Sequence, residues 1–111
     1  MAHIKKIELM EEYLNTATTA LAEMEQSLEK YVESHQQIAL LSEYYGSEEW
    51  FEACSIDEKG GFPQDLRRGV LTQDLVYNLL IDNHQLAIKM LEAATKSLSV
   101  FNGEKWSKFR H

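Results

Sequence analysis

The feature that most constrains how this chain folds is a long seven-residue repeat in its N-terminal part. Neither Gly nor Pro occurs between Ile4 and Tyr45. Mostly apolar side chains recur there at alternating steps of three and four, which places them on one face of a helix. We predict one helix over residues 4–45, about 60 Å long at 1.5 Å per residue, ended by Gly46. The repeat comprises Ile7, Met10, Leu14, Ala17, Leu21, Met24, Leu28, Tyr31, His35, Ile38, Ser42 and Tyr45.

A second long helix is predicted over residues 72–102, because Thr72 is a good N-terminal cap and a glycine follows at position 103. At 100° per residue, its charged and amide side chains fall in one narrow stripe, and the remaining surface is mostly apolar. One partner helix cannot cover so wide a surface. We expect self-association through a two-fold axis to cover the rest; the alternative is docking of a different protein. The candidate dimer-interface residues are Tyr77, Ile81, His84, Ile88 and Leu91.

The predicted fold class is therefore all-α. We expect a long antiparallel helical hairpin with a short-helix insert between the two long helices, and a four-helix core in a homodimer. At 111 residues the chain is expected to form a single helical domain. Its predicted segments are the long helix 4–45, the short-helix connection 46–71, the second long helix 72–102 and the tail 103–111.

The connection over residues 46–71 carries most of the chain's turn-forming residues. Ser47 is placed to cap a short helix, which the pair Gly60-Gly61 ends. Pro63 suits the first turn of another short helical piece that runs through Arg68 and stops at Gly69. We therefore predict a folded connection rather than a slack linker.

Three stretches in and beside the connection are distinctive. They are YYGSEEWF at 44–51, FPQDLRRGVLTQDLVYNLL at 62–80 and LAIKMLEAATK at 86–96. Together they resemble a bacterial family of small helical proteins that is classed as a domain of unknown function. The most specific segments are YYGS-x-EW and P-x-DL-x-RGVL-x-x-D, and the resemblance spans about Ile4 to Lys96. It implies the helical architecture but no activity, and it brings no catalytic or binding residues to this chain.

Aromatic and charged side chains of the connection are the candidates for binding a partner. An aromatic surface bordered by charge suits peptides or cationic groups. The interpretation that we favour for the aromatic residues is a small core that seals this end of the hairpin. The partner-binding candidates are Tyr44, Tyr45, Glu49, Trp50, Asp65, Arg67 and Arg68.

The two arginines of the connection have two interpretations. Arg67 and Arg68 could bind a phosphate or a carboxylate. We expect them instead to pair with Glu48, Glu49 or Glu52 and to fasten the two connecting pieces together.

The histidines and the cysteine give no recognisable chemistry. Neither His35 nor His84 follows a Glu at the spacing of a diiron site, and no His-Glu-x-x-His motif occurs. We predict no metal and no cofactor. Cys54 is the only cysteine and is expected to be an inert, half-buried thiol. Whether Cys54, His35 and His84 are functional or structural stays open at this point.

Charge and hydropathy exclude several classes of partner. A net charge of −7 repels nucleic acid and anionic membrane surfaces, and no apolar run approaches the roughly 20 residues that span a bilayer. The N-terminal residues lack the apolar core of a signal peptide, so we predict a cytoplasmic protein. The tail segment 105–110 interleaves bases with aromatic residues, a pattern that contacts membranes or single-stranded nucleic acid. We expect it to fold back onto the bundle or to fray.

These features lead to one functional prediction and one alternative. No motif indicates catalysis, so we predict a non-catalytic protein-interaction or regulatory module that forms a homodimer and presents its connection to an unidentified protein partner. The alternative is a small enzyme whose carboxylate and histidine side chains meet only in the folded dimer.

Overall fold

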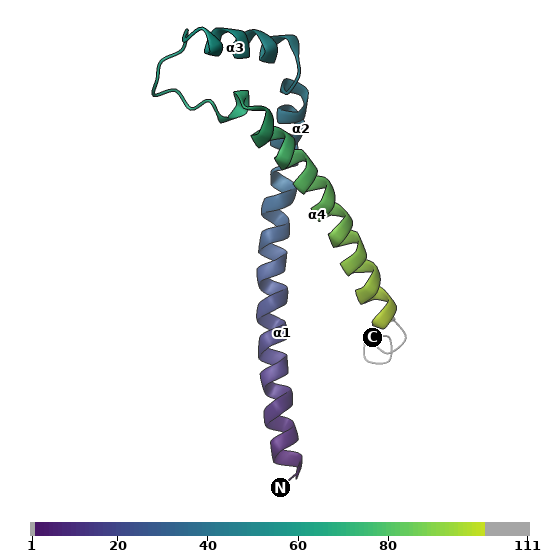
Figure 1. Cartoon of the computed structure of the whole chain (residues 1–111). Helices are drawn as coiled ribbons and strands as arrows, with labels where there is room; N and C mark the ends of the chain where they lie inside the picture. Colours follow the sequence, from purple (N-terminus) through teal and green to yellow (C-terminus); the bar gives the residue numbers. More distant parts are fainter. Residues whose placement is uncertain (1, 102–111) are drawn as a thin grey trace. The chain divides into compact units, whose positions relative to one another are not determined.

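The structure is a computed structural model that describes residues 2–101; the tail segment discussed above lies outside the described residues. Every secondary-structure element in this range is helical, which confirms the all-α prediction. The chain forms two compact units, one ending at Leu40 and the other beginning at Leu41. The elements in chain order (Figure 1) are α1 (Ala2–Glu33), α2 (His35–Tyr44), α3 (Glu48–Glu58), the 3₁₀-helix η1 (Gly69–Leu71) and α4 (Gln73–Val100).

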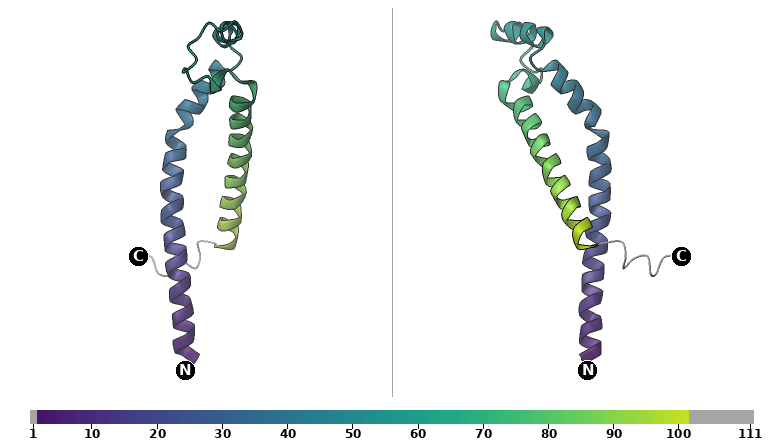
Figure 2. Two further views of the ribbon diagram at one scale, coloured as in Figure 1. Left: turned by 60° about the vertical axis from the view of Figure 1, so that its left-hand side comes forward. Right: turned by 90° about the vertical axis from the view of Figure 1, so that its right-hand side faces the viewer.

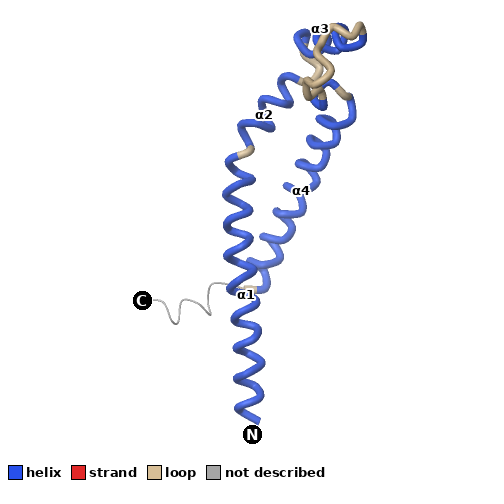
Figure 3. Tube along the Cα trace, turned by 90° about the vertical axis from the view of Figure 1, so that its left-hand side faces the viewer, coloured by secondary structure: helices blue, strands red, loops and turns tan. Residues whose placement is uncertain are grey.

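The first unit consists of α1 and the beginning of α2. The helix predicted over residues 4–45 is interrupted at Ser34, where Figure 3 draws a short turn between α1 and α2. The Ser34 amide donates to the carbonyls of both Lys30 and Tyr31, at 3.1 and 3.0 Å. The Ser34 hydroxyl also donates to the Tyr31 carbonyl, at 2.6 Å. Such a local side-chain bond competes with the regular ladder and bends helices, and the seven-residue pattern does not reveal it.

The second unit begins with the end of α2 and the cap of α3. Gly46 adopts φ +82°, the left-handed conformation expected of the residue that stops a helix. Ser47 is the N-cap of α3, as predicted, and its hydroxyl oxygen accepts from the amide of Trp50 at 3.1 Å. The same hydroxyl donates back to the Tyr44 carbonyl at 2.7 Å. Ser47 therefore joins the last turn of α2 to the first turn of α3.

The C-terminal end of α3 is a Schellman motif built on Gly60, which adopts φ +71°. The Gly60 amide donates to the Asp57 carbonyl at 3.0 Å, and the Gly61 amide donates to the Ile56 carbonyl at 2.9 Å. A Cβ on Gly61 would lie 2.6 Å from Cγ2 of Ile56. Both glycines are therefore needed, the first for its conformation and the second for space, as the Gly60-Gly61 pair predicted.

The segment between α3 and α4 departs from the prediction. The short helical piece predicted from Pro63 to Arg68 is wrong: this segment is irregular, with one turn closed by the Leu66 amide and the Pro63 carbonyl at 3.2 Å. Gly69 does not terminate a helix but begins η1, which contacts both α3 and α4. A stretch of five residues after Pro63 is too short to form a stable helix by itself, because nucleating a helix is costly and few hydrogen bonds follow.

The second long helix forms nearly as predicted, over Gln73–Val100, and it runs without a break in both views of Figure 2. Thr72 occupies the N-cap position. Its hydroxyl does not cap α4, however, but donates to the Gly69 carbonyl at 2.7 Å, and its amide donates to the same oxygen at 3.1 Å. Thr72 thus closes η1 rather than opening α4.

The hydrophobic core of the described residues is very small. Trp50 and Val76 are its buried side chains, each 5% exposed, and both belong to the second unit. In the first unit most apolar positions of the repeat are exposed, whereas Tyr31 and Ile38 are half-buried. The large exposed ones are Ile7, Met10, Leu14, Leu21, Met24 and Leu28. On α4 the exposed apolar side chains are Leu75, Tyr77, Leu79, Ile81, Leu86, Ile88, Leu91, Leu98 and Val100.

The left-handed glycine at the end of α3 gives a first test. Replacing Gly60 with Ala should lower the free energy of unfolding by about 1 kcal/mol, because an L side chain is strained in this conformation. Urea unfolding at a fixed protein concentration, followed by circular dichroism, measures the change. Gly60→Asn is the matched control and should cost clearly less, since Asn tolerates this region. Equal stability of the Ala variant and the natural protein would contradict the left-handed turn.

Candidate functional site

Trp50 is the centre of the best-packed part of the chain. It lies in the first turn of α3, and its indole ring makes edge contacts with the rings of Tyr45 and Phe51, each at 5.0 Å between centroids. Its Nε1 donates to the carbonyl of Val70 at 2.8 Å. A buried indole N–H needs such a partner. The connection is therefore built on a small aromatic core, the interpretation favoured from the sequence.

Three side chains in the second unit bind backbone carbonyls where η1 leads into α4. Besides Trp50, the hydroxyl of Tyr45 donates to the carbonyl of Gln73 at 3.2 Å, and the thiol of Cys54 donates to the carbonyl of Leu71 at 3.6 Å. These contacts join segments that are 17 to 28 residues apart in the sequence. The end of α2 and the first turns of α3 thus hold the start of α4 through its main chain.

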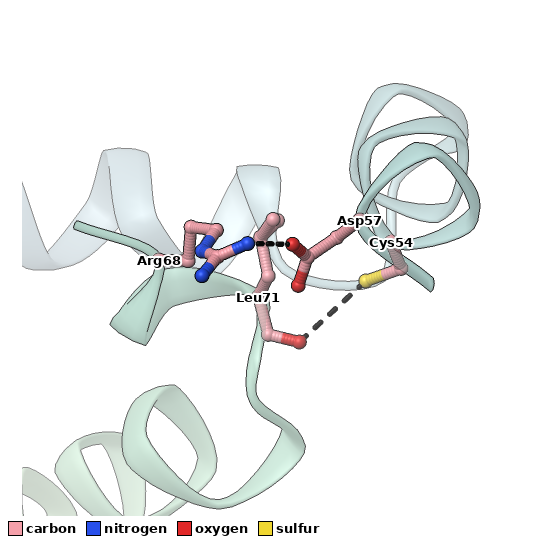
Figure 4. Close-up of polar contacts among 4 residues, drawn as sticks. All are labelled: Cys54, Asp57, Arg68 and Leu71. Carbon is pink, nitrogen blue, oxygen red and sulfur yellow. Dashed lines mark hydrogen bonds and ion pairs between the residues drawn. The ribbon is translucent and has the colours of Figure 1, made fainter. Parts of the chain in front are cut away.

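One ion pair completes this set of contacts, as Figure 4 shows. Nη1 of Arg68 lies 2.6 Å from Oδ1 of Asp57, and both side chains are about one third exposed. The predicted role of Arg68, to fasten the connection, is thus supported, but its partner is Asp57 rather than the Glu48, Glu49 or Glu52 that we expected. A charge-assisted bond of this length is favourable, although partial exposure to water limits its contribution to stability.

An open cleft of about 430 Å³ lies beside these contacts. One wall is α3 and the other is formed by residues at the start of α4. The cleft has apolar and acidic lining, because it contains aromatic rings as well as two neighbouring carboxylates at the end of α3. Its lining residues are Trp50, Phe51, Cys54, Asp57, Glu58, Leu71 and Gln73.

The predicted partner-binding residues separate into those that hold the connection together and those at its surface. Trp50 is buried, and Tyr44, Tyr45 and Arg68 are half-buried. The exposed members are Glu49, Asp65 and Arg67. The cleft contains only Trp50 from the predicted set, so the remaining candidates do not converge on it.

Sequence reasoning missed Cys54, Asp57 and Glu58 as parts of this site. The spacing of residues along α3 could have revealed part of this site. Trp50, Cys54 and Asp57 are four and three residues apart, so they lie on one face of the helix. Glu48 and Glu52 fall on the opposite face, which explains why neither meets Arg68. The length and course of the irregular segment before η1 decide where Arg68 lies, and no sequence pattern gives these.

The histidines and the predicted dimer interface lie elsewhere. His35 is exposed and makes an edge contact with the ring of Tyr31 at 4.7 Å, and His84 is exposed on α4. The predicted interface residues Tyr77, Ile81, Ile88 and Leu91 are also exposed. Within residues 2–101, no three side chains of the His, Cys, Asp and Glu types lie together as a possible metal site. None of the described helices combines the length and apolar character needed to cross a membrane.

The indole hydrogen bond gives a second test. Trp50→Phe should lower the free energy of unfolding by roughly 2 kcal/mol, because it removes the donor to the Val70 carbonyl and part of a buried ring. Phe51→Leu is the control on the neighbouring ring, which is 61% exposed, and should cost less than about 1 kcal/mol. Thermal or urea unfolding measures both. A larger loss for Phe51→Leu would contradict the central position of Trp50.

The ion pair gives a third test, a double-mutant cycle with Asp57→Asn and Arg68→Gln. We expect a coupling energy of roughly 0.5 to 1 kcal/mol, which falls as salt is added, because the pair is partly exposed. The matched cycle replaces Arg68→Gln with Arg67→Gln and should show no coupling. Equal coupling in the two cycles would mean that Arg68 has no specific partner.

Comparison with known families and proteins places these features in a wider context. The chain matches the family model described as "Domain of unknown function (DUF4298)" over residues 7–93. This match covers all of α2, α3 and η1 together with most of α1 and α4. No curated protein matches the chain, and no solved structure does. Because the matched residues make up well over half of the sequence, the chain belongs to the DUF4298 domain family.

Proposed function

We propose that this protein is a non-catalytic protein-interaction module that works as a homodimer. In this proposal α1 packs antiparallel to α4, and two copies together enclose a four-helix core. The connection between the long helices is then presented to a protein partner. The observation that carries the proposal is the large number of apolar side chains on α1 and α4 that neither unit covers by itself.

The first unit supports this proposal most directly. It consists of one long helix and the first turns of another, and a single helix cannot bury its own apolar face. Leu14 and Leu21 are 59% and 73% exposed on that face. Burying one such side chain is worth roughly 1.5 to 3 kcal/mol, and most of the stability of helices in proteins comes from packing of such an apolar face.

The second unit supports the proposal that more than one helix covers α4. Its own packed residues lie at the Gln73 end of α4, where η1 makes contact. Beyond them the apolar side chains occupy several faces of the helix, and only a narrow stripe is polar. A hairpin partner would cover one of these faces, and a second copy of the chain supports the remainder through a two-fold axis.

The surface of the connection supports a role in contacting another protein. Arg67, Asp65 and Glu49 are exposed, whereas the side chains beneath them are bound to each other and to the main chain. A rigid base with exposed charged side chains is suited to recognition, because few groups have to be ordered on binding. Cys54 is the chain's one cysteine, so no disulfide can form within one chain, and this supports a cytoplasmic setting for the module.

Light scattering coupled to size exclusion tests the homodimer. The natural protein should show twice the 12.8 kDa mass of one chain. Ile81→Glu should weaken the dimer at least about a hundredfold, because the two-fold axis places the buried charge in the interface twice. Gln85→Glu is the matched control, since it adds the same charge on the polar stripe of α4, and it should leave the mass unchanged.

A natural protein that stays monomeric at every concentration would overturn the homodimer. Equal dissociation by Ile81→Glu and Gln85→Glu would overturn the assigned interface and leave dimer formation itself standing.

A further inference from the structure

The cleft beside α3 contains a specific combination of groups. The Phe51 ring is 61% exposed and lines the cleft together with Glu58. Asp57 is bound by Arg68, so the carboxylate of Glu58 remains as the cleft's other negative charge. An exposed ring beside a carboxylate suits a ligand that combines aromatic and cationic side chains, since both groups find a complement there.

The chain itself contains such a segment after α4. Residues 105–110 read Lys-Trp-Ser-Lys-Phe-Arg and combine three positive charges with two aromatic rings. They also follow the stretch that matches the family model, which ends at residue 93. The charge of this segment is opposite to that of α3, where five of eleven residues are acidic and none is basic.

The segment cannot reach the cleft of its own chain. Leu71 and Gln73 place the cleft at the first residue of α4, and Figure 1 shows α3 at this end of α4. The 28 residues of α4 extend about 42 Å. From Phe101 the nine residues to Arg110 reach at most about 32 Å even when fully extended. The cleft and the segment therefore meet only if they come from different copies.

An antiparallel pair of α4 helices brings them together. When a two-fold axis lies perpendicular to α4, the last residues of one copy lie beside the first residues of the other. We propose that residues 105–110 of each copy occupy the cleft of the second copy, with a basic side chain near Glu58 and an aromatic ring against Phe51. This inference rests on the proposed homodimer. It adds that the two α4 helices run antiparallel and that each copy makes the same contact with the other.

A charge exchange between two full-length variants tests the contact. Glu58→Lys reverses the charge of the cleft, and Arg110→Glu reverses a charge of the segment. Each variant alone should dimerise roughly tenfold more weakly than the natural protein, because each homodimer contains two repulsive contacts. In a mixed dimer one contact is the natural pair and the other is the exchanged pair, so both attract. Mixing should therefore restore dimers of nearly natural strength.

Sedimentation velocity on each variant and on their equimolar mixture measures this effect. Glu52→Lys is the matched control, because Glu52 lies on the same helix, is exposed and does not line the cleft. It should not weaken the dimer, and mixing it with Arg110→Glu should give only partial recovery, because one repulsive contact remains in that mixed dimer. Full recovery that is specific to the mixture with Glu58→Lys would support the proposal.

The remaining outcomes separate this inference from the proposed function. If the natural protein dimerises and the mixture shows no recovery, the exchanged contact is wrong and the homodimer stands. If the natural protein is monomeric, both are wrong. A second measurement uses the single natural cysteine: Ser107→Cys should form a disulfide with Cys54 of the second copy under mild oxidation, whereas Ser99→Cys should not. Peptide mass spectrometry that finds no link between positions 54 and 107 would count against the contact.

Discussion

The second unit depends on the hydrogen bond from the Trp50 indole to the carbonyl of Val70. A 3₁₀-helix of three residues leaves carbonyls near its C-terminal end without amide partners inside it, and donors from elsewhere can bind these and neighbouring carbonyls. The side chains of Tyr45, Trp50 and Cys54 supply these donors to Gln73, Val70 and Leu71. The direction in which α4 leaves the connection is set in this way by polar contacts around one buried ring rather than by a large core.

The rest of the helical surface packs against little else within its own unit. The chain therefore has two kinds of feature that stabilise helices: contacts at helix ends and apolar faces along the helices. Local contacts such as the Ser47 cap and the Gly60 turn fix the ends of helices but bury little apolar area. The apolar faces of α1 and α4 carry most of the area that burial could stabilise. In the proposed homodimer these faces are buried on association, so folding and association are coupled.

The sequence predicted well those features that depend on neighbouring residues. Ser47, Gly46 and the Gly60-Gly61 pair mark helix ends because capping and left-handed turns involve only a few consecutive residues. The break at Ser34 was not predicted, because serine within a strong apolar repeat is compatible with a continuous helix until its hydroxyl finds a carbonyl. The sequence predicted that Arg68 pairs with an acidic residue of α3, but it did not predict that this residue is Asp57. The irregular segment from Gly61 onward decides where the guanidinium of Arg68 lies.

The hydrogen bonds from the Tyr45, Trp50 and Cys54 side chains all end on main-chain oxygens, and this has an evolutionary consequence. A carbonyl is supplied by every residue type, so the recipient positions carry no sequence requirement from these hydrogen bonds. The Val70 side chain is 40% exposed and that of Gln73 is also exposed. Substitutions there can alter the surface of the connection while its geometry is retained, as long as the donors on α2 and α3 are kept. Members of one lineage can thus differ in the side chains at this surface while the geometry of the connection is kept.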